Sequence, residues 1–156
     1  MPELAGREQE VWDVFISHRG ADNNADIKMT FVSFLHARLQ QAGITAFMDE
    51  ESLEAGDNAW TIMTDAVSRC RIAVPVLTEC FGNSLCCLEE LALMVKARRH
   101  IMPLFLAGDF DKLLEQIKSS SNKLRNRVSQ ETFQSWQEAI DSVFACTGLR
   151  QDQFSR

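Results

Sequence analysis

A histidine and an arginine stand side by side in the short stretch Ser17-His18-Arg19-Gly20, near the beginning of the chain. Histidine is a common general base, and arginine binds phosphate and carboxylate groups. No serine or cysteine arrangement for nucleophilic catalysis accompanies His18, so we interpret it as part of a pocket lining. Gly20 is expected to permit a tight turn and the close approach of a ligand.

Two adjacent glutamates, Glu89 and Glu90, are the second group of residues that could do chemistry. The residues around them have apolar side chains at helical spacing, namely Leu88, Leu91, Ala92 and Val95. On such a helix Glu90 falls on the side away from the core, whereas Glu89 lies beside the apolar stripe. The periodicity alone therefore indicates a solvated Glu90 and singles out neither glutamate for a function.

Apolar runs and helical patterns alternate along the first two thirds of the chain. The runs are typical of parallel strands buried on both faces, and they are Val11–Ser17, Ile44–Met48, Ile72–Leu77 and Ile101–Leu106. The first two helical stripes hold Phe31, Phe34, Leu35, Leu39 and Ala42, and then Trp60, Met63, Ala66 and Val67. This alternation predicts an α/β protein with a flavodoxin-like three-layer fold, in which helices flank a central parallel sheet of about five strands.

The last third of the chain has a weaker pattern. Phe110–Lys118 and Glu131–Ala145 are predicted helices, and we expect the fifth strand in or near Asn122–Val128. Pro75 and Pro103 lie inside predicted strands, although proline cannot donate a hydrogen bond to a sheet. An edge position or a local bulge would accommodate them.

Ligands of open parallel sheets bind outside the carboxyl ends of the strands. The segments after the first three predicted strands are therefore candidate binding loops, namely Ser17–Asp22, Asp49–Asp57 and Thr78–Ser84. A dinucleotide-binding turn requires several glycines, and Ser17–Asp22 has one. Thr78 stands where phospho-receiver domains have their acceptor aspartate. The sequence argues against both of these functions.

The composition narrows the choice of partners further. The 156 residues have a net charge of −6 and no basic stripe, so we expect no dedicated nucleic-acid binding. No apolar run reaches the roughly 18 residues of a membrane span, and no signal peptide is present, so we expect a cytoplasmic protein without a membrane partner. Five cysteines without zinc-site spacing indicate reduced thiols and no metal.

The decamer Asp13–Asp22 (DVFISHRGAD) resembles DVFLSFRGED, the usual opening box of plant Toll/interleukin-1 receptor (TIR) domains. Four further stretches resemble, in order, the BB loop, third strand, CLDEL box and last helix of that family: Phe47–Gly56, Cys70–Thr78, Cys87–Leu91 and Ser135–Ala139. The resemblance implies a TIR domain over residues 11–148, an N-terminal leader at 1–10 and a C-terminal tail at 149–156. It implies either a TIR-only NAD+ hydrolase immune protein or a TIR segment of a larger receptor.

The resemblance also implies an activity. TIR domains of this kind are NAD+ glycohydrolases, which release nicotinamide and ADP-ribose or cyclic ADP-ribose variants as an immune and cell-death signal. NAD+ would be the substrate, and no cofactor is expected. The family's catalytic glutamate corresponds to Glu90. One carboxylate is chemically sufficient, because the nicotinamide leaving group is already cationic and needs no general acid.

The resemblance implies contacts with NAD+ for six residues, namely Ser17, His18, Arg19, Gly20, Glu54 and Trp60. Arg19 would bind the pyrophosphate or ribose, Glu54 the ribose, and Trp60 would stack on a nucleobase. Each has an alternative that the sequence leaves open. Arg19 could pair with Asp22 or Asp49 at the surface, Glu54 could lie in a solvated loop, and Trp60 could pack against the sheet.

Self-association is a further implication, because in this family the BB loop of one protomer completes the site of its neighbour. This chain departs from the family at a symmetric self-association face, where Ser33-Phe34 replaces the usual Ser-His pair. Phe81 and Cys86 replace a frequent Tyr and Trp near the pocket. The alternative function is a non-enzymatic module that recruits other TIR domains through the same surfaces, with Glu90 as an ordinary surface residue.

Overall fold

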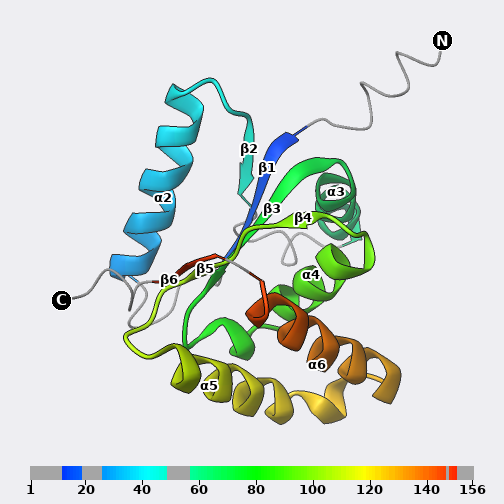
Figure 1. Ribbon diagram of the computed structural model, residues 1–156. Coiled ribbons are helices and arrows are strands. Elements are labelled where there is room, and N and C mark those ends of the chain that lie inside the picture. Colours follow the sequence, from blue (N-terminus) through cyan, green and yellow to red (C-terminus); the bar gives the residue numbers. More distant parts are fainter. Residues whose placement is uncertain (1–11, 19–25, 49–56, 147, 151–156) are drawn as a thin grey trace.

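Six parallel strands form the centre of the computed structural model, which describes residues 12–18, 26–48, 57–146 and 148–150 (Figure 1). For residues 26–30, 57–60 and 149 the description covers the backbone alone. The strands pair in the order β2-β1-β3-β5-β6, and β4 also pairs with β3. Their bounds are Trp12–Ser17 (β1), Ala46–Met48 (β2), Cys70–Leu77 (β3), His100–Ile101 (β4), Leu104–Phe105 (β5) and Leu149–Arg150 (β6). The predicted parallel α/β fold is confirmed.

Helices cover both faces of this sheet. Helix α2 stands alone on one side, whereas α3, α4 and α6 lie on the other side and α5 crosses below them in the view of Figure 1. The helices are α2 (Asp26–Gln41), α3 (Asp57–Ser68), α4 (Leu85–Lys96), α5 (Phe110–Lys123) and α6 (Gln130–Phe144), with 3-10 turns η2 (Phe81–Asn83) and η3 (Arg125–Arg127). The result is the expected three-layer arrangement.

Alternate residues of β1 face opposite layers of the molecule. Phe15 lies in the larger core cluster, which also includes buried residues of α3, α4, α5 and α6. Val14 and Ile16 lie in the smaller cluster, together with Val32 of α2. This alternation follows from the two-residue repeat of a strand. It assigns Ser17, two residues after Phe15, to the face of β1 that α4 covers.

The predicted strand Ile101–Leu106 is divided into β4 and β5. Ile72 and Ala73 of β3 pair with β4, and Val76 and Leu77 pair with β5. The ladder on this side of β3 is thus interrupted beside Pro75, and Pro103 lies in the gap between the two short strands. Both prolines therefore occur where the pairing on this side of β3 is interrupted. Since β3 lies between β1 and β5, the edge alternative is wrong for Pro75.

The expected position of the fifth strand is wrong. Residues 122–128 hold the end of α5 and the exposed turn η3, and the last strand of the sheet is β6. A side chain at Gly148 would clash with the carbonyl oxygen of Pro103, so glycine permits the close approach of the chain to β5. Arg150 lies over the ring of Phe110, 4.0 Å from its centroid. The sheet therefore extends to Arg150, into the predicted tail.

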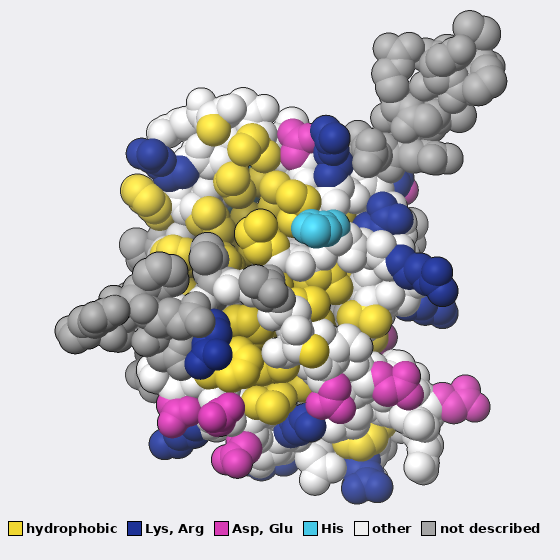
Figure 2. Space-filling view, in the orientation of Figure 1, with side chains coloured by type: hydrophobic (Ala, Val, Ile, Leu, Met, Phe, Trp, Pro, Cys, Tyr) yellow, Lys and Arg dark blue, Asp and Glu magenta, His cyan; other side chains and the backbone are white. Residues whose placement is uncertain are grey.

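Helix α2 buries only part of the apolar stripe that the sequence predicted, because Leu35 and Leu39 pack on the core and the two phenylalanines do not. Phe31 and Phe34 are 39% and 62% exposed, whereas Val32 is buried. Figure 2 shows hydrophobic side chains gathered on the visible face in the region of α2. The helix packs on the sheet through Val32, Leu35 and Leu39, which also have helical spacing. Two overlapping stripes are present in this sequence, and the smaller side chains face the core.

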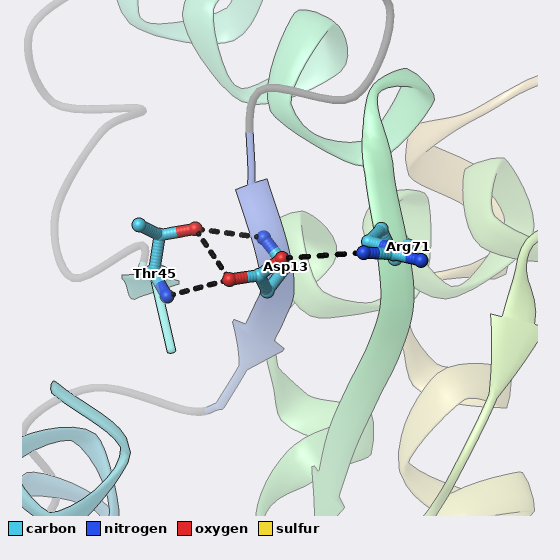
Figure 3. A network of polar contacts seen from close by, with 3 residues as sticks. All are labelled: Asp13, Thr45 and Arg71. Carbon is cyan, nitrogen blue, oxygen red and sulfur yellow. Dashed lines mark hydrogen bonds and ion pairs between the residues drawn. The ribbon is translucent and has the colours of Figure 1, made fainter. Parts of the chain in front are cut away.

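Asp13 joins the amino ends of three strands (Figure 3). Its Oδ2 accepts hydrogen bonds from the backbone N–H and the hydroxyl of Thr45, at 2.9 and 3.0 Å. Its Oδ1 lies 3.9 Å from Arg71 of β3, in an exposed ion pair. The hydrogen bonds from Thr45, and then the charge of Arg71, lower the pKa of the Asp13 carboxyl below its ordinary 3.8. This cluster connects β1 to β3 and to the residue before β2.

Candidate functional site

Ser17 is the last residue of β1 and is fully buried. Its Oγ donates a hydrogen bond to Oε1 of Glu90 on α4. The two residues are 73 positions apart in the sequence. They come into contact because Ser17 points to the same face of β1 as Phe15, and α4 packs on that face. A hydroxyl and a carboxylate therefore meet at the carboxyl end of the central strands, where this class of sheet binds ligands.

Glu90 is 2% exposed, so the expectation of a solvated side chain is wrong. Helix α4 begins at Leu85, where Ser84 caps it by accepting from the backbone N–H of Cys87 at 3.1 Å. The helix then packs against β1, α3 and α6 together, so its buried face is wider than one apolar stripe. A buried carboxylate is costly unless it is hydrogen-bonded, and the contact with Ser17 meets part of this requirement.

Cys86 provides a second donor to the same carboxylate. Its Sγ lies 3.3 Å from Oε2 of Glu90, and Glu90 follows Cys86 by about one turn of α4. Residues four apart on a helix share a face, which is why the thiol reaches the carboxylate. Both oxygens of Glu90 thus have a donor, one from the strand and one from the helix. The sequence interpretation missed this contact, although the spacing of the two residues could have indicated it.

Glu89 has a different neighbourhood from Glu90. Its Oε1 accepts a hydrogen bond from Nε1 of Trp136, at 3.3 Å, and Trp136 is fully buried in α6. Glu89 also lines an open groove between α4 and α6 with Glu131, Glu138 and Lys96. Glu89 therefore connects two helices, and the residue that caps α4 is Ser84.

The other predicted site residues are described only in part. His18 follows Ser17 directly and is 6% exposed. Trp60 lies in α3, although its side chain is outside the described part of the structure. Arg19, Gly20 and Glu54 lie outside the described residues altogether. The structure thus brings together Ser17 and Glu90 of the predicted set, with His18 adjacent in the chain.

Phe81 is a core residue. It is fully buried in η2 and belongs to the larger core cluster. A Cβ at the following residue, Gly82, would lie 2.6 Å from the carbonyl oxygen of Ile117, so glycine allows η2 to contact α5 closely. Of the two departures from the family pattern near the pocket, Phe81 is a packing residue, and Cys86 contacts the candidate catalytic group.

Within the described ranges, no group of three or more His, Cys, Asp or Glu side chains is arranged to hold a metal ion. The five cysteines are all described, and none of them forms a disulfide bond. No described helix has both the length and the apolar character needed to cross a membrane.

Comparison with known protein families matches residues 14–143 to the TIR domain. The chain therefore belongs to the TIR-domain family. Over 101 residues it is 38% identical to the probable 2' cyclic ADP-D-ribose synthase BdTIR of Brachypodium distachyon, and the match covers 65% of this chain and 43% of that protein. It is 31% identical over 157 residues to the disease resistance-like protein CSA1 of Arabidopsis thaliana, covering 91% of this chain and 12% of that protein.

A solved structure has the same fold. The TIR domains of the activated Roq1 resistosome, which directly recognizes the pathogen effector XopQ, match with a TM-score of 0.74 and 26% sequence identity, over 90% of this chain and 87% of that chain. This chain spans only part of these relatives, namely 43% of the length of BdTIR and 12% of the length of the disease resistance protein LAZ5 of Arabidopsis thaliana.

Proposed function

We propose that this chain is a NAD+ glycohydrolase that releases nicotinamide and ADP-ribose, or cyclic ADP-ribose variants, as an immune signal. The observation that carries the proposal is the Glu90 carboxylate, which is buried beside the carboxyl end of β1 and accepts hydrogen bonds from Ser17 and Cys86. Membership of the TIR-domain family supports it. So does the similarity to BdTIR, which is itself named as a probable 2' cyclic ADP-D-ribose synthase.

The chemistry requires one well-placed carboxylate. The bond between nicotinamide and ribose breaks heterolytically, nicotinamide leaves as a neutral molecule, and positive charge develops on the ribose. A carboxylate near the ribose hydroxyls stabilises this oxocarbenium charge electrostatically. A carboxylate has about four positions that can accept hydrogen bonds, so donors on Oε1 and Oε2 of Glu90 still leave capacity for the sugar hydroxyls.

Ser17 has a role in this proposal that differs from a direct substrate contact. Its hydroxyl is fully buried and donates to Glu90, so we assign Ser17 to holding the carboxylate in place. His18, Arg19, Gly20, Glu54 and Trp60 remain the proposed NAD+ contacts, with Arg19 as the cationic partner of the pyrophosphate or ribose. NAD+ is the substrate in this account, and no cofactor is required.

Self-association is the proposed route to activation. Phe31 and Phe34 present a partly apolar surface on α2, and the matched Roq1 TIR domains belong to a resistosome. A contact between copies of this chain, or with other TIR domains, would bury this surface. The same surface also favours the alternative function, a non-enzymatic TIR–TIR interaction module. In either case we propose that the protein acts in the cytoplasm.

The direct test is incubation of the concentrated protein with NAD+ while nicotinamide release is followed by chromatography. We expect catalytic turnover, with a rate per molecule that rises with protein concentration, because the proposed site is completed by a neighbouring copy. The absence of nicotinamide at high protein concentration, including on an oligomeric scaffold, would contradict the enzyme and favour the interaction module. A rate per molecule that is independent of concentration would contradict activation by self-association.

A further inference from the structure

Cys86 is the second side chain that donates a hydrogen bond to Glu90 at the candidate site. Its thiol donates to Oε2 of Glu90 across 3.3 Å, and its side chain is half-buried. The other oxygen, Oε1, accepts from Ser17. Donors from two different elements therefore approach the carboxylate, Ser17 from the end of β1 and Cys86 from the first turn of α4.

We propose that Cys86 is a positioning residue for Glu90, whose thiol fixes the plane of the carboxylate that meets the ribose of NAD+. This inference rests on the proposed NAD+ cleavage. Cys86 would not touch the substrate itself and would act through the orientation of Glu90.

The physical reason lies in the last torsion of the glutamate side chain. This sp³–sp² torsion has a broad preference, so the side chain alone does not fix the plane of the carboxylate. One donor, from Ser17, restrains the position of Oε1. The second donor restrains Oε2, and the two together define the plane. A thiol is a weak donor, but an ionised acceptor strengthens the bond.

A thiol that only fills space at this position would behave differently. Cys86→Ala removes the donor, and Cys86→Ser keeps a donor on a side chain of nearly the same shape. If Cys86 positions Glu90, alanine lowers kcat and kcat/KM together with little change in KM, since the orientation matters in the transition state. If Cys86 only packs, both variants change the unfolding temperature and leave kcat near the wild-type value.

The kinetic experiment compares the wild type, Cys86→Ala, Cys86→Ser and the control Cys146→Ala in nicotinamide release. Cys146 bonds to the backbone of Ser142 on α6, outside the site. We expect Cys86→Ala to lower kcat about 3- to 10-fold, in line with the loss of one hydrogen bond. Cys86→Ser should recover most of the rate, and the control should match the wild type. A wild-type kcat for Cys86→Ala, or equal losses for alanine and serine, would overturn the positioning role.

A second measurement does not depend on activity. The infrared S–H stretching band of Cys86 is isolated as the difference between wild-type and Cys86→Ala spectra, and it should move to higher wavenumber in Glu90→Gln because an amide accepts more weakly than a carboxylate. An unmoved band would overturn the thiol contact and the positioning role with it. A shifted band in a wild-type protein without nicotinamide release would instead overturn the proposed NAD+ reaction.

Discussion

Two carboxylates lie near opposite ends of β1, and they have contrasting environments. Asp13, near the amino end, has a side chain that is 39% exposed, and it accepts from the backbone and hydroxyl of Thr45 beside the Arg71 cation. Glu90, beside the carboxyl end, is 2% exposed and accepts from the side chains of Ser17 and Cys86. The first carboxylate connects strands, and the second is enclosed at the edge of the sheet where ligands bind.

We propose from this comparison that Asp13 has a structural role and Glu90 a catalytic one. An exposed carboxylate with local partners loses little solvation and stabilises the strand ends modestly. A buried carboxylate loses much of its solvation, which costs free energy that its hydrogen bonds offset only in part. The burial of Glu90 is therefore poorly explained by stability, and we interpret it as the requirement of a chemical function. The following changes test this difference.

Glu90→Gln is expected to have the largest effect. It should lower NAD+ cleavage by about 10²–10³-fold, the usual loss when one electrostatic stabiliser of a transition state is removed. The unfolding temperature should stay the same or rise, because a neutral amide of the same shape replaces a buried charge. Nicotinamide release and thermal unfolding by circular dichroism measure the two outcomes. A large loss of stability would show that Glu90 has a structural role like that of Asp13.

Ser17→Ala is expected to have the next largest effect. Loss of a hydrogen bond to a charged group should reduce turnover by roughly tenfold or more. Because Ser17 acts through Glu90, the same change in a Glu90→Gln background should reduce turnover much less. The double-mutant cycle in nicotinamide release measures this coupling. Independent, additive losses would indicate instead that Ser17 contacts NAD+ directly.

Glu89→Ala should affect stability and leave catalysis nearly intact. The change leaves the buried Nε1 of Trp136 without the carboxylate that accepts from it, which typically costs about 1–3 kcal/mol. Glu89→Gln is the matched control, because the amide carbonyl can still accept from Trp136. Urea unfolding of the two variants checks the difference. A Glu89→Ala protein as stable as the wild type would remove the proposed connection between α4 and α6.

Asp13→Asn is expected to have the smallest effect, which should depend on pH. The folded-state pKa of Asp13 is lowered, first by the backbone hydrogen bond from Thr45. The carboxylate therefore contributes stability above its ordinary pKa of 3.8, and this contribution is lost as the pH falls through the lower folded value. Unfolding temperatures at about pH 7 and about pH 2 should show a difference between variant and wild type that shrinks in acid. A constant difference would contradict the assignment.

The sequence predicted the elements that position the site because their patterns are long. The apolar runs of β1 and β3 and the stripe of α3 are strong signals, and the alternation along β1 is enough to assign Ser17 a face. The sequence did not predict β6, because two residues carry no periodic signal and their position depends on the contact between Gly148 and Pro103. Long-range packing of this kind is not visible in local patterns.

The candidate site was predicted by resemblance and not by periodicity. An apolar stripe indicates a single buried face of a helix. Helix α4 contacts β1, α3 and α6, so a wider part of its surface is buried, and the stripe wrongly predicted that Glu90 is exposed. The same limitation applies to α2, where the larger Phe31 and Phe34 side chains are exposed and Val32 faces the sheet. The contacts of Ser17 and Cys86 with Glu90 needed the tertiary structure, although the helical spacing of Cys86 was present in the sequence.

The most direct test of the central claim is the ranking of the two neighbouring glutamates. Nicotinamide release should be measured for Glu90→Gln and Glu89→Gln at equal, high protein concentration, with folding checked by circular dichroism. The two substitutions are chemically identical and one residue apart. We predict near-wild-type turnover for Glu89→Gln and a loss of about 10²–10³-fold for Glu90→Gln. Equal turnover in the two folded variants, or the reverse ranking, would contradict the assignment of Glu90 as the catalytic carboxylate.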